Sequence, residues 1–106
     1  MPLVAILTNC PDTETADRIT DALITARLVA SANRYARIHS RHHWQGTIDS
    51  AQEHPLLVKT RPELADAVEA EITRLHPYDV PAILRIAMEA NAAYLDWIAA
   101  ETTPPP

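Results

Sequence analysis

The segment from residue 31 to residue 60 restricts the fold most, because its thirty residues contain a single glycine, Gly46, near the middle. Glycine readily adopts the positive φ that a tight hairpin turn requires. The segment therefore predicts two long strands, at about residues 31–44 and 47–60, joined by a turn at WQGT. Pro55 has no backbone N–H, so we expect the second strand to bend, bulge or lie at a sheet edge there.

Such a hairpin is long for a chain of this size. A strand of about 14 residues, at roughly 3.3 Å per residue, spans about 45 Å. The 106 residues fit one domain, whose radius of gyration is about 13 Å. An overhanging hairpin exposes backbone groups that other copies of the chain can cover. The sequence thus predicts an oligomer, unless the hairpin bends over its own core or ends in a loop.

The remaining elements follow from apolar periodicity and from capping residues. Asp12 is a good N-cap, Pro62 suits a first helical turn, and Asn91 precedes the last helical pattern. Besides the hairpin strands, we predict strands at 2–9 and 82–88 and helices at 13–28, 62–75 and 91–101. This order, β-α-β-β-α-β plus a terminal helix, predicts an α+β, ferredoxin-like fold with an antiparallel sheet and two helices on one face. We expect residues 1–101 to form this single domain and the Pro-rich residues 102–106 to be disordered.

Charge is unevenly distributed along the chain. The net charge is −5, yet residues 22–48 contain four arginines and no acid. This basic segment is either a solvated face or a surface that contacts anions or other subunits. The acidic total argues against nucleic acid as a partner.

The expected location is the cytoplasm. The single cysteine, Cys10, cannot form an internal disulfide, which fits a reducing compartment. The first residues lack the basic region of a secretory signal, and no apolar run is long enough to span a membrane. No paired carboxylates, zinc spacing or nucleophile elbow indicates an enzyme.

Several short stretches occur in the order and spacing of one family: TNCPD, WQG, LLVKT preceded by Glu53, LHPYDVPAIL and YLDWI. From about residue 3 to residue 98 the chain resembles the CutA-type divalent-cation tolerance proteins. The resemblance implies a non-enzymatic homotrimer, with interlocking hairpins, that binds a divalent metal ion, chiefly copper. Its architecture is similar to that of the PII signalling proteins, so a trimer that binds a small anionic metabolite or nucleotide at subunit clefts is the alternative. A stable trimer without a ligand is a third interpretation.

His76 is the metal candidate that the resemblance implies. Pro77 disfavours helical geometry at His76, so a helix must end there, and a histidine also suits a helix C-terminus. These structural roles are the alternative to metal binding. The family often has cysteine where this chain has Ser31, and sometimes where it has Thr8, which weakens a copper(I) site. Another departure is His42, which replaces a frequent tyrosine.

Six residues match positions of the family's pocket between subunits. Buried aromatic side chains with polar ends usually require polar partners, so the group is either a network that holds a trimer together or a pocket for a small anion. The six residues are Trp44, Glu53, Lys59, Tyr78, Tyr94 and Trp97.

The cluster HSRHHW resembles a chelating motif, but strand geometry argues against a site within one chain. On a strand, His39 and His43 share a face about 13 Å apart, whereas His42 and His43 point to opposite faces. A metal site that these histidines share between chains remains an alternative.

Overall fold

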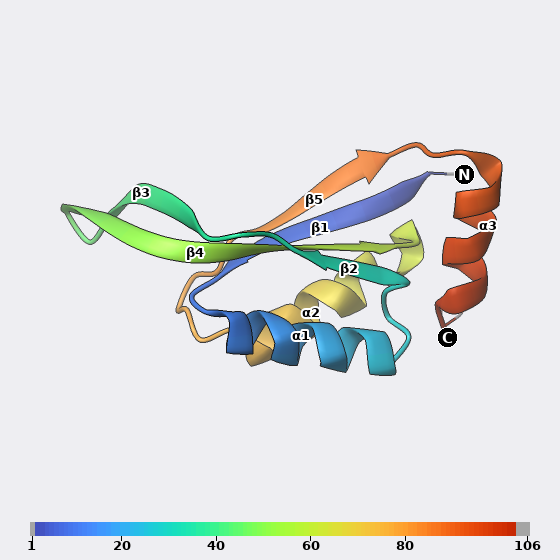
Figure 1. Cartoon of the computed structure of the whole chain (residues 1–106), viewed down its shortest axis with the longest axis horizontal. Helices are drawn as coiled ribbons and strands as arrows, with labels where there is room; N and C mark the ends of the chain where they lie inside the picture. Colours follow the sequence, from blue (N-terminus) through green and yellow to red (C-terminus); the bar gives the residue numbers. More distant parts are fainter. Residues whose placement is uncertain (1, 104–106) are drawn as a thin grey trace.

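The structure is a computed structural model and describes residues 2–103. One antiparallel sheet has the strand order β2-β4-β1-β5, with β3 paired to the outer half of β4. Helices α1 and α2 lie together on one face of this sheet, and α3 lies at the end opposite the hairpin tip (Figure 1). The elements are β1 (Leu3–Cys10), α1 (Thr13–Thr25), β2 (Ser31–Arg34), β3 (Ile38–Trp44), β4 (Thr47–Thr60), a 3-10 turn η1 (Pro62–Leu64), α2 (Ala65–Leu75), β5 (Ile83–Met88) and α3 (Ala92–Glu101). The predicted ferredoxin-like fold with a C-terminal helix is confirmed.

The core lies between the sheet and the two helices. Alternate residues of β1 point toward the helices, and Val4, Ile6 and Cys10 belong to the buried core. They pack in one cluster with Ile19 of α1 and Ile72 of α2, both of which are fully buried. The apolar helical spacing read from the sequence therefore identifies the buried helix faces.

The long hairpin projects beyond the body of the molecule, as predicted (Figure 1). The molecule measures 45 × 24 × 22 Å along its principal axes. Gly46 has φ +82° and Gln45 has φ +50°, so both central residues of the turn are left-handed, as a two-residue hairpin turn requires. Within residues 2–103, β3 pairs with no strand other than β4. The hairpin thus neither folds back over the core nor ends in a long loop.

A bulge divides the first hairpin strand, which we had predicted to be continuous from 31 to 44. Arg34 pairs with Leu56 and Ile38 pairs with Glu53, so three residues of one strand lie opposite two of the other. Pro55 stays within β4, and its carbonyl accepts a hydrogen bond from the Tyr35 N–H at 2.9 Å. Because Pro55 cannot donate in return, the ladder is disrupted in the opposing strand. The extra residue also reverses which face of the strand each later side chain occupies.

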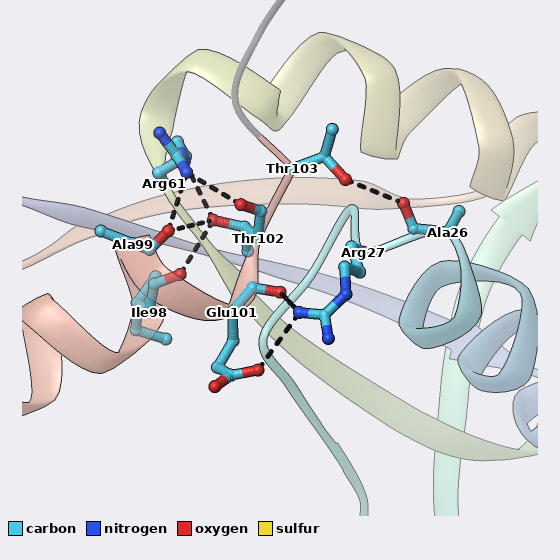
Figure 2. A network of polar contacts seen from close by, with 8 residues as sticks. All are labelled: Ala26, Arg27, Arg61, Ile98, Ala99, Glu101, Thr102 and Thr103. Atoms are coloured by element: carbon cyan, nitrogen blue, oxygen red, sulfur yellow. Dashed lines mark hydrogen bonds and ion pairs between the residues drawn. The ribbon is translucent and has the colours of Figure 1, made fainter.

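Two predicted boundaries are wrong. Helix α1 ends at Thr25 and not at residue 28, because Arg27 adopts the left-handed φ of 57°. The predicted tail begins too early: Thr102 is only 4% exposed, and the Thr103 N–H donates to the Arg27 carbonyl at 2.8 Å. Figure 2 shows Arg61 bound to Thr102, Arg27 bound to Glu101, and the Thr103 hydroxyl bound to the Ala26 carbonyl. Residues 104–106 of the predicted tail lie outside the described residues.

Candidate functional site

A groove with a volume of about 660 Å³ lies between the hairpin and the loop that follows α2. We call it the hairpin groove. Its floor is one face of the hairpin, where His42 is the register partner of Asp49 and Ser40 is the partner of Ala51. The lining residues are Ser40, Arg41, His42, Trp44, Asp49, Ser50, Ala51 and Glu53 of the hairpin, with Asn9, Tyr78, Asp79, Val80 and Ala82 opposite.

A chain of polar contacts joins the groove to the end of α2. The Tyr78 hydroxyl donates to Glu53 Oε2 at 3.0 Å, and the Tyr78 backbone N–H donates to His76 Nδ1 at 3.3 Å. Since Nδ1 accepts, Nε2 carries the proton and donates to the Asn9 carbonyl at 2.8 Å. The His76 and Tyr78 rings lie 4.6 Å apart. His76 thus fixes the helix end to strand β1, which is a structural role.

Electrostatics keep the Tyr78 phenol protonated. Burial, which makes the largest contribution, and the hydrogen bond to Glu53 together raise the pKa of Tyr78 to about 12. The phenol therefore remains a hydrogen-bond donor to Glu53 throughout the physiological pH range.

The six residues of the predicted pocket form two groups within one chain. Trp44, Glu53 and Tyr78 line the hairpin groove. Lys59 lies six residues farther along β4, about 20 Å away at roughly 3.3 Å per residue. Its ammonium group donates to Asn33 Oδ1 at 2.8 Å.

Tyr94 and Trp97 belong to the second group, at the α3 end of the sheet. Their rings stack with centroids 5.7 Å apart, and the Tyr94 hydroxyl lies 3.5 Å from Ser31 Oγ. Ser31 is the register partner of Lys59, so these residues occupy the same end of the sheet. A single pocket that contains all six residues would require a neighbouring chain.

The histidine cluster adopts the strand geometry predicted for it. His39 and His43 pair with Gln52 and Ile48 on one face of the hairpin, whereas His42 lies on the groove face opposite Asp49. Within residues 2–103, no three side chains of His, Cys, Asp or Glu are grouped closely enough to hold a metal ion. Sequence reasoning missed Asp49 as a groove residue, although counting outward from the Gly46 turn places it opposite His42.

Cys10 is an inert thiol in this fold, and its position before α1 does not activate it. The residue is fully buried. Burial, with smaller contributions from the carboxylates of Asp12 and Glu53, raises the pKa of the Cys10 thiol to about 11.

We expect the native protein at pH 8 to react with a thiol reagent about 100-fold more slowly than the chain in denaturant, because so little thiolate is present. Stopped-flow labelling with and without denaturant measures both rates. Equal rates would contradict the burial of Cys10.

With an antiparallel sheet, two helices on one face and a projecting hairpin, the chain belongs to the class of ferredoxin-like α+β proteins. A family model described as CutA1 divalent ion tolerance protein matches residues 4–101. The chain belongs to this family.

Relatives and solved structures agree with this assignment. The divalent-cation tolerance protein CutA of Pyrococcus horikoshii is 38% identical over 102 residues, which cover 94% of this chain and 98% of the relative. The protein of the same name from Thermus thermophilus is 37% identical, over 92% of this chain and 95% of its own length.

The crystal structure of CutA1 from Oryza sativa superimposes with a TM-score of 0.92 at 29% identity, covering 97% of this chain and 95% of that structure. CutA1 from Pyrococcus horikoshii gives a TM-score of 0.89 at 35% identity, over 95% and 99% of the two chains. Names of relatives differ in location: one from Archaeoglobus fulgidus is called periplasmic, and one from rice is called chloroplastic. Within residues 2–103, no helix has the length and apolar character to cross a membrane.

Proposed function

We propose that the protein acts in tolerance of divalent cations as a non-enzymatic homotrimer that binds a cation of the copper type. Membership of the CutA1 family, over residues 4–101, is the observation that carries this proposal. The relatives reported above are named for cation tolerance and not for nucleotide signalling, so the PII-like alternative is not retained. We propose the cytoplasm as the location, in keeping with a single buried thiol.

Two features of the chain support a homotrimer. The sheet face opposite α1 and α2 presents Leu84, Ile86 and Met88, which are 53%, 42% and 37% exposed. Arg85, the intervening residue, points to α2, where it pairs with Asp66. An apolar sheet face of this kind usually packs against another chain. The projecting hairpin would reach a neighbour in the same assembly.

The assembly would also complete the predicted pocket. The groove of one chain contains Glu53 and Tyr78, while the group around Lys59 lies at the opposite end of β4. A hairpin that extends along a neighbouring subunit would carry its groove toward the neighbour's Lys59 end. We propose that the six-residue pocket forms in this way, from two chains.

His76 is the metal ligand that we propose within each chain. Ligating histidines usually donate their second ring N–H to a carbonyl or carboxylate, and the Nε2–H bond of His76 to Asn9 fits this arrangement. The metal would then bind Nδ1, in place of the Tyr78 N–H that now lies 3.3 Å away. One imidazole does not make a metal site, so the additional metal ligands must come from other side chains or from neighbouring chains.

Calorimetry with Cu²⁺ tests this assignment. We expect His76→Ala to weaken binding by about tenfold or more, the usual effect of losing one ligand or its supporting contact. His54→Ala is the matched control, because it removes an imidazole outside the contacts described above. Identical isotherms for wild type and His76→Ala, with the trimer intact, would remove His76 from the metal site. Absence of Cu²⁺ and Zn²⁺ binding by the wild type would overturn the proposed function.

A further inference from the structure

One residue of the turn after α2, Tyr78, contacts both the proposed metal ligand and the proposed subunit pocket. Its backbone N–H donates to His76 Nδ1 at 3.3 Å, and its hydroxyl donates to Glu53 Oε2 at 3.0 Å. Both partners are buried, since His76 is 7% exposed and Glu53 is 6% exposed. A carboxylate accepts several hydrogen bonds, so the bond to Tyr78 is compatible with the neighbour's Lys59 at the same carboxylate.

The lone pair of His76 Nδ1 cannot bind the Tyr78 N–H and a metal ion at the same time. An unprotonated imidazole nitrogen has a single acceptor position, and imidazole binds zinc at about 2.0–2.1 Å. The Tyr78 nitrogen lies 3.3 Å from Nδ1, so an ion on the line between them would be only about 1.3 Å from that nitrogen. The Tyr78 backbone must therefore move away when a metal binds.

The structure indicates which side of the contact moves. The imidazole is fixed to β1, because its Nε2–H donates to the Asn9 carbonyl at 2.8 Å. Pro77, the intervening residue, has a restricted φ and absorbs little of the change. Beyond Tyr78 the chain continues in an irregular bend, where Val80 is 72% exposed. Tyr78 is thus the part that can shift, and its shift withdraws the hydroxyl from Glu53.

We infer that Tyr78 couples the two proposed sites, so that the His76 lone pair binds either the Tyr78 N–H, with the phenol on Glu53, or a metal ion, with the phenol released. The inference rests on the proposed function, because it takes His76 as the metal ligand. It adds a positioning residue and a direction of coupling. Such coupling is reciprocal: loss of the phenol–Glu53 bond favours metal binding, and bound metal weakens the contact between Tyr78 and Glu53.

Calorimetry of the full chain with Cu²⁺ tests the direction of this coupling. Tyr78→Phe keeps the ring and the backbone N–H but removes the hydroxyl, so one hydrogen bond fewer is broken when the metal binds. We expect this variant to bind Cu²⁺ about tenfold more tightly than wild type, the factor expected for one hydrogen bond to a charged group. A residue that only supports the metal site would give the opposite sign, because its loss weakens binding.

Tyr35→Phe is the matched control. It removes the hydroxyl of a tyrosine that is 50% exposed and lies outside these contacts, so it should bind Cu²⁺ like wild type. Glu53→Ala tests whether the effect passes through Glu53. In that background Tyr78→Phe should have no further effect, because the phenol no longer has a carboxylate to bind. Comparison of the two backgrounds also removes any direct effect of the Glu53 charge on the cation, and size-exclusion chromatography verifies the assembly of each variant.

Hydrogen exchange of the wild type, measured by mass spectrometry, is a second readout that requires no variant. Bound Cu²⁺ should increase the exchange of the amide of Tyr78, since this N–H loses its acceptor. Wild-type or weaker Cu²⁺ affinity in Tyr78→Phe, or unchanged exchange of this amide in the presence of the metal, would overturn the inference. The proposed function fails by a different result, identical isotherms for wild type and His76→Ala, so the two failures are distinguishable.

Discussion

The variant Leu84→Asp is expected to be a folded monomer at a protein concentration at which the wild type forms the proposed trimer. Leu84 is 53% exposed on β5 and lies beside Leu7 of β1, on the sheet face opposite α1 and α2. A carboxylate at the centre of a packed apolar interface costs several kcal/mol per copy, on the order of the energy that holds such an interface together. Light scattering coupled to size exclusion measures the mass, and circular dichroism verifies the fold.

Ala70→Asp is the matched control for this experiment. It adds the same charge on the exposed side of α2, away from the sheet face that carries Leu84, and should leave the proposed trimer intact. If Leu84→Asp unfolds, Ile86→Glu tests the same face at a position that is 42% exposed. A wild-type protein that is monomeric at micromolar concentration would contradict the trimer and, with it, the pocket built from two chains.

The hairpin was predictable because its signals are local. A chain with one glycine can form a two-residue left-handed turn with little strain at one place only, and Gly46 occupies that place. The apolar periodicity of the two long helices was equally local, and so was the helix end at His76, which Pro77 enforces. These features fixed the order of the elements and hence the fold class.

What sequence reasoning missed depends on contacts between distant residues. The bulge opposite Pro55 requires knowledge of which strand pairs with it and in which register. The arrangement of the candidate pocket could not be predicted for a similar reason: matching positions to a family gives a set of residues, but not which chain supplies each of them. Within one chain, Glu53 lies at the middle of β4 and Lys59 near its C-terminal end, about 20 Å away at roughly 3.3 Å per residue.

The C-terminal segment was mispredicted because its partners are distant in sequence. Thr102 and Thr103 resemble the start of a polar tail, yet Arg61 donates to the Thr102 carbonyl and hydroxyl, both at 2.9 Å. The same guanidinium donates to the Ala99 carbonyl at 2.8 Å, so it binds carbonyls that the end of α3 would leave without partners (Figure 2). Arg27 donates to the Glu101 carbonyl at 3.1 Å.

We therefore expect a chain that ends at Glu101 to be less stable than a chain that ends at Thr103, by about 2–4 kcal/mol in the free energy of unfolding. Truncation leaves the Arg61 guanidinium with one of its three hydrogen bonds, that to the Ala99 carbonyl, and removes Thr102, a residue that is only 4% exposed. Urea titrations of both chains at one protein concentration measure the difference. Hydrogen exchange should locate the loss of protection in α3, because Arg61 and Thr102 together join this helix to the end of β4.

Arg61→Lys separates charge from geometry at this contact. Lysine keeps the positive charge near the helix C-terminus but cannot donate to three acceptors in the fork of a guanidinium, so it should retain only part of the stability. If the chains that end at Glu101 and at Thr103 were equally stable, with unchanged hydrogen exchange in α3, the hydrogen bonds to Thr102 would make no net contribution to stability. The apolar packing of Ile98 alone would then hold the helix. An intermediate value for Arg61→Lys, in contrast, would assign the difference to the bidentate contacts, since the charge is the same in both proteins.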